Sequence, residues 1–108
     1  MAYTDVKETF NKMPETFNPS SAQGLDVVFQ FAITGEDGGD WNVAVKEGTC
    51  QVQEGTYGSP NVTLTMSGDT WLAIVNKKTS GMQAFMTGKL KASGDIMLAQ
   101  RIQQLFPL

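Results

Sequence analysis

Residues 25–34 read Leu-Asp-Val-Val-Phe-Gln-Phe-Ala-Ile-Thr, and apolar side chains recur there at every second position. A period of two is typical of a β-strand, because successive side chains point to opposite faces of a sheet. The apolar face of this strand would consist of Leu25, Val27, Phe29, Phe31 and Ile33. The stretch therefore predicts a long strand with one side against a hydrophobic core.

Shorter alternating runs follow over residues 41–46, 50–53 and 62–66, with a tight-turn signal at Glu47-Gly48 and a break from Gly55 to Pro60. Their spacing of about ten residues predicts an antiparallel meander of four strands. Residues 89–93 alternate as well, and we expect a fifth strand there. Its lysines suit an edge position, because lysine discourages unwanted strand pairing.

Helical patterns lie on both sides of these strands. The spacing of Val6, Phe10 and Met13 predicts a helix, which we expect to end near Lys12 because Pro14 disfavours helical geometry in the residue before it. A short turn is predicted over residues 18–24, a helix capped by Ser67 or Asp69, a short helix over 81–87 and one last helix after Gly94-Asp95. Together these elements predict an α+β fold with a five-stranded, mostly antiparallel sheet.

The chain has 108 residues, no histidine and one cysteine, Cys50. The length favours one domain over residues 1–108. The missing histidine excludes a Ser-His-Asp triad, a Cys-His dyad and a His-Glu-x-x-His zinc site. One cysteine forms neither an internal disulfide nor a four-cysteine zinc site. We therefore expect no enzyme, no cofactor and no metal.

The remaining candidates for chemistry are weak. The glycines between residues 35 and 39 precede a predicted strand, so they do not form a dinucleotide fingerprint. Glu36, Asp37 and Asp40 share one turn and could bind a hard cation weakly, but a plain turn is favoured. Cys50 is expected to act as a small hydrophobic residue.

The net charge of −3 speaks against nucleic-acid binding. Its distribution is uneven, because residues 61–108 carry five basic and two acidic side chains. Lys77, Lys78, Lys89 and Lys91 form either an ordinary solvated surface or a weakly attractive surface for anionic head groups. No apolar run has the length of a membrane helix, and the first residues do not read as a signal peptide, so we expect a cytoplasmic protein.

Methionine is concentrated in the second half of the chain, at Met66, Met82, Met86 and Met97. Its flexible side chain suits surfaces that repack around varied apolar partners, although a plain core would use it too. The predicted helix over residues 81–87 is apolar for its length. Loosely tied apolar helices over a sheet can leave a cavity between the layers.

Several stretches resemble the sterol carrier protein-2 type lipid-binding domain family, in an order that covers nearly the whole chain. They are Phe17-Asn18-Pro19, Val28-Phe29-Gln30-Phe31, Trp41 after its glycine turn, the passage Pro60–Ser67, the block Ala84–Lys91 and Leu105-Phe106. The resemblance implies helices over one face of the sheet and an apolar tunnel between the two layers. It also implies non-catalytic binding, and transfer, of a fatty acid, fatty acyl-CoA or sterol-like ligand.

Further expectations follow from this resemblance. The chain ends in Phe106-Pro107-Leu108 rather than Ser-Lys-Leu, so we expect a prokaryotic cytosolic protein rather than a peroxisomal one. The partners would be a lipid and, transiently, an anionic membrane, with the protein a monomer or homodimer. Twelve residues are expected to line the ligand site: Phe29, Phe31, Trp41, Val43, Met66, Trp71, Val75, Met82, Phe85, Met86, Ile102 and Phe106.

Lys89 or Lys91 could meet an acidic head group at the mouth of the site. One alternative is a structural or dimerisation domain whose core is closed and holds no ligand. Another is an enzyme that uses carboxylate or lysine chemistry on a lipid, although no such site is assembled by the sequence.

Overall fold

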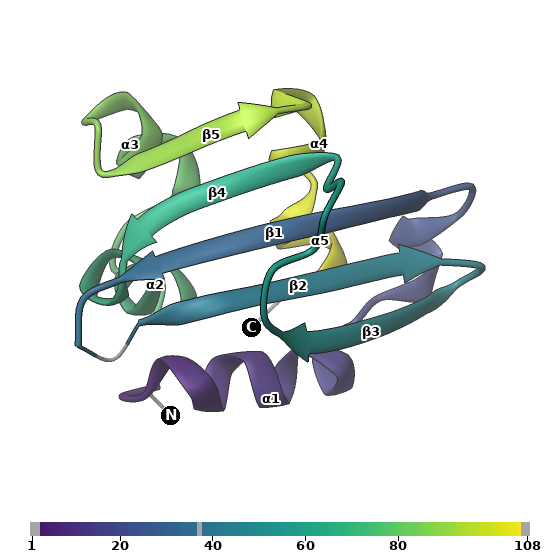
Figure 1. Cartoon of the computed structure of the whole chain (residues 1–108), viewed down its shortest axis with the longest axis horizontal. Helices are drawn as coiled ribbons and strands as arrows, with labels where there is room; N and C mark the ends of the chain where they lie inside the picture. The colour runs from purple at the N-terminus through teal and green to yellow at the C-terminus, as the bar shows by residue number, and fades with distance from the viewer. Residues whose placement is uncertain (1–2, 37, 107–108) are drawn as a thin grey trace.

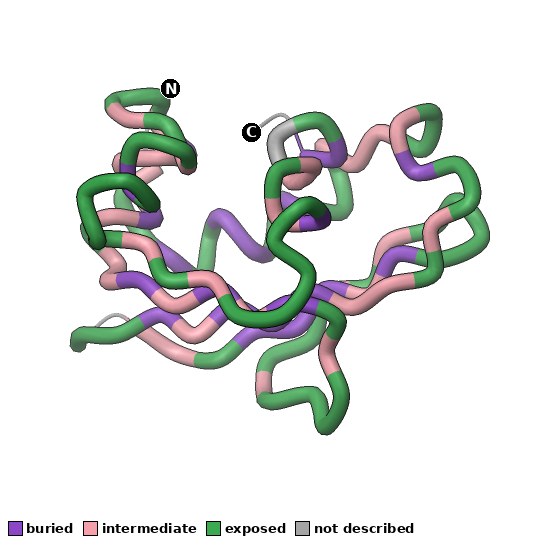
Figure 2. Tube along the Cα trace, turned by 90° about the horizontal axis from the view of Figure 1, so that it is seen from above, coloured by how far each residue is buried: buried purple, intermediate pink, exposed green. Residues whose placement is uncertain are grey.

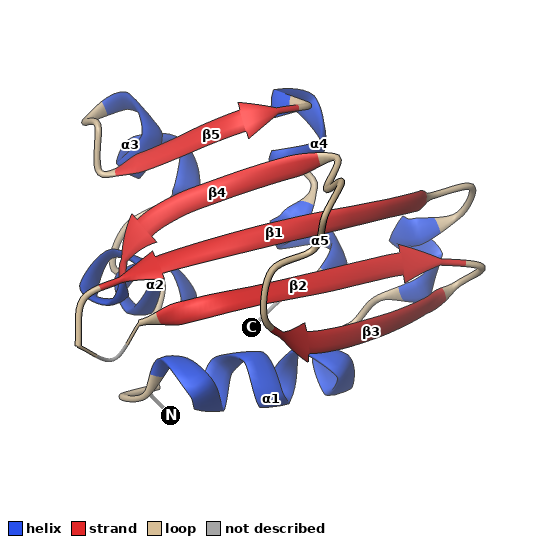
Figure 3. Ribbon diagram, viewed as in Figure 1, coloured by secondary structure: helices blue, strands red, loops and turns tan. Residues whose placement is uncertain are grey.

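The computed structural model describes residues 3–36 and 38–106. A five-stranded sheet spans the molecule in the order β3-β2-β1-β4-β5 (Figures 1 and 3). The strands are β1 (Asp26–Thr34), β2 (Gly39–Lys46), β3 (Thr49–Glu54), β4 (Val62–Ser67) and β5 (Leu90–Gly94). All five lie where the alternating patterns predicted them, and β5 forms one edge of the sheet.

The pairing of β4 differs from the prediction. β1 with β2, β2 with β3, and β4 with β5 pair antiparallel, so the sheet is mostly antiparallel. However, β4 pairs with β1 in parallel, and the predicted four-stranded meander is wrong. The chain leaves β3, crosses over β2 and β1 on one face of the sheet and enters β4 beyond them (Figure 1).

The crossing segment, residues 55–61, is held on that face by the side-chain amides of two buried residues. The Gln30 amide nitrogen donates to the carbonyl oxygen of Gly55, and the Asn42 amide nitrogen donates to the same oxygen. The Gln30 amide oxygen accepts from the backbone N–H of Tyr57 at 2.7 Å. Because Gln30 and Asn42 are register partners on β1 and β2, the crossing lies directly over this pair.

The helices all lie on the other face of the sheet (Figure 2). They are α1 (Val6–Thr16), the 3₁₀ turn η1 (Pro19–Ala22), α2 (Gly68–Val75), α3 (Gly81–Met86), α4 (Ile96–Ala99) and α5 (Ile102–Leu105). Side-chain caps begin five of them: Asp5 accepts from Lys7 N–H, Asn18 from Ser20 N–H, Ser67 from Thr70 N–H, Ser80 from Gln83 N–H and Asp95 from Leu98 N–H. Each cap satisfies a donor that has no partner within its helix.

Two helix predictions need correction. α1 continues through Pro14 to Thr16 instead of ending near Lys12. Phe10 and Met13 are fully buried, so packing against the core outweighs the local preference of the residue before proline. The single C-terminal helix is divided into α4 and α5, because the N–H groups of Arg101 and Gln104 bond three residues back rather than four.

Aromatic rings pack closely over β1 and β2. Phe10 of α1 stacks on Trp41 at a ring-centroid distance of 4.9 Å and on Trp71 at 5.2 Å. Its ring also meets Phe31 edge-on at 5.3 Å. α1 therefore fills the space above β1 and β2, and the other half of the sheet is left for α2 to α5.

Candidate binding pocket

A pocket of about 220 Å³ lies between the sheet and helices α2 to α5. Its floor comes from β1, β4 and β5 and consists of Phe31, Leu64, Met66, Leu90 and Ala92. The strand register explains this grouping. Leu64 lies beside Phe31 and Ala92, and Met66 lies beside Leu90, so their side chains share one face.

Four short helices form the wall of the pocket. Its remaining lining residues are Trp71, Ile74, Gly81, Met82, Phe85, Ile96, Ala99, Gln100 and Ile102. Met82, Phe85 and Ile96 are also exposed to solvent, so they lie at the mouth of the pocket. The pocket thus opens between α3 and α4.

Only one lining side chain, that of Gln100, is polar, and none of the lining residues is titratable. The thiol of Cys50 is on β3, outside the pocket, and burial raises its pKa to about 11. A raised thiol pKa disfavours the reactive thiolate. The lining therefore offers apolar burial and one neutral hydrogen-bonding group.

Six of the twelve residues expected to line a ligand site do line this pocket: Phe31, Met66, Trp71, Met82, Phe85 and Ile102. Five others, Phe29, Trp41, Val43, Val75 and Phe106, are buried in the core around it. Met86 lies on α3 and is 77% exposed. Contact of any of these residues with a ligand stays a prediction.

Sequence reasoning missed eight lining residues: Leu64, Ile74, Gly81, Leu90, Ala92, Ile96, Ala99 and Gln100. The period of two in the strands could have identified part of the pocket floor. Leu64 and Met66 alternate on β4, so the choice of Met66 implied Leu64 as well. In the same way, Leu90 and Ala92 alternate on β5.

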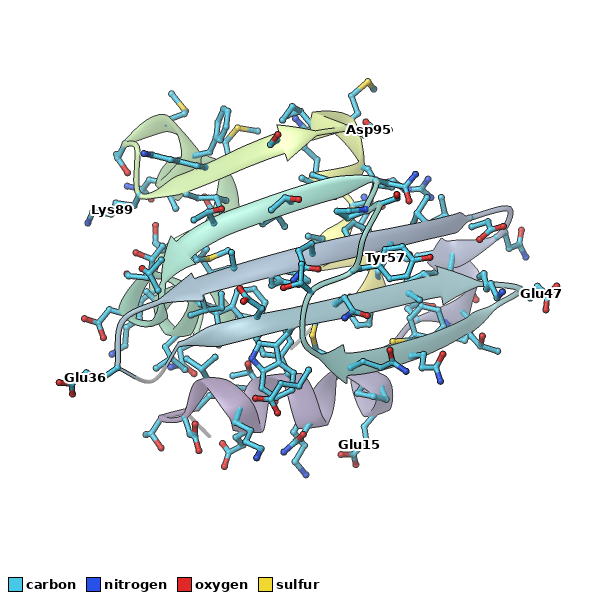
Figure 4. All side chains as sticks on the ribbon, in the orientation of Figure 1. Glu15, Glu36, Glu47, Tyr57, Lys89 and Asp95 are labelled. Carbon is cyan, nitrogen blue, oxygen red and sulfur yellow. The ribbon has the colours of Figure 1, made fainter. Side chains whose placement is uncertain are left out.

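The two lysines considered for a head group are placed differently. Lys91 lies between Leu90 and Ala92 on β5, so its side chain points to the face opposite the pocket. The structure does not bring it to the mouth. Lys89 is exposed at the end of β5 next to α3, where Figure 4 shows it reaching into solvent.

The three carboxylates considered for a cation lie in the turn after β1. Asp37 lies outside the described residues, and Glu36 and Asp40 are exposed. Among the described residues, no group of three or more potential metal ligands occurs. None of the helices described there is long and apolar enough to cross a membrane.

Comparison with known proteins matches residues 10–107 to the SCP-2 sterol transfer family. Hydroxysteroid dehydrogenase-like protein 2 of Bos taurus is 32% identical over 104 residues, covering 93% of this chain and 24% of that protein. This chain thus spans about a quarter of that relative's length.

Two solved structures share the fold. Palmitated sterol carrier protein 2 like 2 of Aedes aegypti has a TM-score of 0.77 and 27% identity, with 94% of this chain and 93% of that one covered. The sec-alkylsulfatase Pisa1 of Pseudomonas sp. has a TM-score of 0.80 at 18% identity, covering 90% of this chain and 15% of that one. This chain belongs to the SCP-2 sterol transfer family, whose domains bind lipids.

Proposed function

We propose that this protein binds one long apolar chain, such as that of a fatty acid, in the pocket over β1, β4 and β5. The observation that carries the proposal is the lining, which is apolar except for Gln100. Burial of an acyl chain against such a surface is favourable by about 0.8 kcal/mol per methylene. The related protein from Aedes aegypti, which is described as palmitated, supports the same ligand class.

The size of the pocket favours a slender ligand. Its volume of about 220 Å³ exceeds the roughly 150 Å³ cavity that takes up benzene in another protein. It is smaller than the ~300 Å³ at which pockets for drug-sized ligands begin. Part of an acyl chain fits this space, whereas the rigid rings of a sterol would require α3 or α4 to move.

The proposal includes no covalent chemistry. Acid–base or nucleophilic catalysis needs a titratable group within reach of the substrate, and the pocket lining contains none. As a monomer or as a homodimer, the protein would carry its ligand between sites and exchange it during brief contact with an anionic membrane. In a longer protein, the same domain would present the lipid to its neighbour.

A titration with the fluorescent fatty acid cis-parinaric acid tests the proposal, with native mass spectrometry to count bound molecules. We expect saturable binding of one molecule per chain. Ala92→Phe should weaken binding about tenfold or more, because the larger side chain occupies part of the space on the pocket floor that the ligand would fill and so removes about 1.4 kcal/mol or more of binding free energy. Ser93→Phe is the matched control, because Ser93 is the next residue on β5, is exposed and faces away from the pocket.

Two results would contradict the proposal. One is a titration without saturation and without a bound mass, which would favour the closed structural domain. The other is equal weakening by Ala92→Phe and Ser93→Phe while both variants stay folded, since the ligand would then lie elsewhere.

A further inference from the structure

The methionines in the described parts of the chain fall into two groups by exposure. Met13 and Met66 are buried, with 0% and 4% of their surface exposed, whereas Met82, Met86 and Met97 are 56%, 77% and 78% exposed. A thioether that solvent reaches is open to oxidation by a peroxide, and one that the core covers is protected. The fold therefore leaves three of these five side chains open to an oxidant.

Met82 differs from the other two exposed methionines in its position. It lines the pocket, as the buried Met66 does, whereas neither Met86 nor Met97 belongs to the lining. Met82 is the second residue of α3 and follows Gly81, which also lines the pocket. Among the described residues, it is the one methionine that both lines the pocket and is exposed. A soluble oxidant thus reaches the lining at Met82 without any opening of the domain.

We propose that Met82 is an oxidation site through which a peroxide lowers the affinity of the pocket for its ligand. With hydrogen peroxide, the O–O bond breaks, one oxygen forms a bond to the sulfur, and the other leaves as water. The sulfur loses two electrons to the peroxide, and the thioether becomes a sulfoxide. The inference rests on the proposed function, because it needs the pocket to be the ligand site.

The sulfoxide weakens binding because the lining has little to pair with it. Oxidation turns a flexible apolar side chain into a polar one that accepts hydrogen bonds. Among the lining side chains, only Trp71 and Gln100 carry donors, and the indole N–H of Trp71 already donates to Oγ1 of Thr9. A ligand that enters the oxidised pocket would strip water from the sulfoxide without replacing its hydrogen bonds. We therefore expect a loss of affinity of roughly tenfold.

The order of oxidation is the first part of the test. Ligand-free protein is treated with hydrogen peroxide, and mass spectrometry with peptide fragmentation follows each methionine separately. The three exposed methionines should gain one oxygen well before Met13 and Met66. Saturation with palmitic acid should slow oxidation at Met82 severalfold and leave the rate at Met97 unchanged, because Met97 lies outside the lining.

The affinity of the oxidised protein is the second part. Catalase removes the remaining peroxide, circular dichroism checks that the fold is intact, and cis-parinaric acid is then titrated. Met82→Leu keeps the lining apolar, so this variant should bind the probe equally well before and after peroxide. Met86→Leu with Met97→Leu is the matched control and should still lose roughly tenfold. Methionine sulfoxide reductases, one for each epimer, should restore the affinity of the unchanged sequence.

Three results would overturn the inference. They are oxidation of Met82 no faster than that of Met66, full affinity in folded protein that carries the sulfoxide at Met82, and an undiminished loss of affinity in Met82→Leu. Failure to bind the probe before peroxide would refute the proposed function and this inference with it. Binding that is saturable before peroxide and unchanged after it would refute this inference alone.

Discussion

The indole Nε1 of Trp71 donates a hydrogen bond of 2.6 Å to Oγ1 of Thr9, and both side chains are buried. The Thr9 hydroxyl in turn donates to the carbonyl oxygen of Val6, also at 2.6 Å. This chain of two hydrogen bonds joins α1 to α2. Because Trp71 also lines the pocket, it ties the position of α1 to one wall of the ligand site.

Thr9→Val should lower the free energy of unfolding by about 1–3 kcal/mol, because it keeps the shape of the side chain but leaves the buried indole N–H without an acceptor. Urea denaturation followed by circular dichroism measures the change. Thr9→Ser retains the hydroxyl and should lose less stability than the valine variant. A stable Thr9→Val variant beside a destabilised Thr9→Ser variant would mean that the methyl group, rather than the hydrogen bond, is what matters here.

Gln30→Leu should destabilise the protein by about 2 kcal/mol, because the N–H of Tyr57 and the carbonyl of Trp41 lose the partner that holds the crossing segment. Gln53→Leu, at an exposed position on the same face of the sheet, should change stability by less than about 0.5 kcal/mol. Thermal unfolding of both variants checks this difference. Affinity for a fatty acid should stay unchanged in both, because the pocket lies on the opposite face, and a large loss in Gln30→Leu alone would refute that separation.

The strands could be predicted from the sequence because each carries its own period of two, as Phe29, Phe31 and Ile33 do on β1. The order of the strands could not, because it depends on contacts far apart in the chain. Nothing in residues 55–61 shows that Gln30 will hold this segment across β1, so a meander was the simplest prediction. The continuation of α1 through Pro14 has the same cause, since the buried site for Met13 lies in other elements.

The site was half predictable for a related reason. Apolar residues identify the core, but they do not show which part of it stays hollow. Phe10 of α1 fills the space beside Trp41, so Val43 and its neighbours are closed off. The short helix α3 covers the half of the sheet near β4 and β5 less completely. Phe85 therefore lines the pocket and is also exposed to solvent. That difference arises from helix placement and not from the composition of either half.

Cys50 should react slowly with iodoacetamide in the folded protein. Burial raises its pKa from 9.0 to about 11. At pH 8 the thiolate fraction in the folded protein is therefore lower than in the unfolded chain by on the order of a hundredfold. The raised pKa means that the folded state holds this proton more tightly than the unfolded state. Stability should therefore be unaffected by this group below pH 9 and should decrease above it.

The rate of alkylation, followed by mass spectrometry in buffer and in concentrated urea, measures this effect. Alkylation should be much faster in urea, where the thiol regains its ordinary pKa. A folded protein that reacts as fast as the unfolded chain would show that the thiol is not protected by burial.

Phe85→Ala and Val43→Ala test two residues that the sequence predicted to line one ligand site. The structure places only Phe85 in the pocket lining, whereas Val43 lies in the core. Phe85 lines the pocket and is 45% exposed, so its loss should weaken fatty-acid binding about tenfold with little change in stability. Val43 is fully buried outside the pocket, so its truncation should cost about 2 kcal/mol of stability and leave affinity unchanged. Titration with cis-parinaric acid and urea denaturation, run on both variants, give the four values needed. A loss of affinity in Val43→Ala at a temperature where it is fully folded would place the ligand in the half of the core that α1 covers.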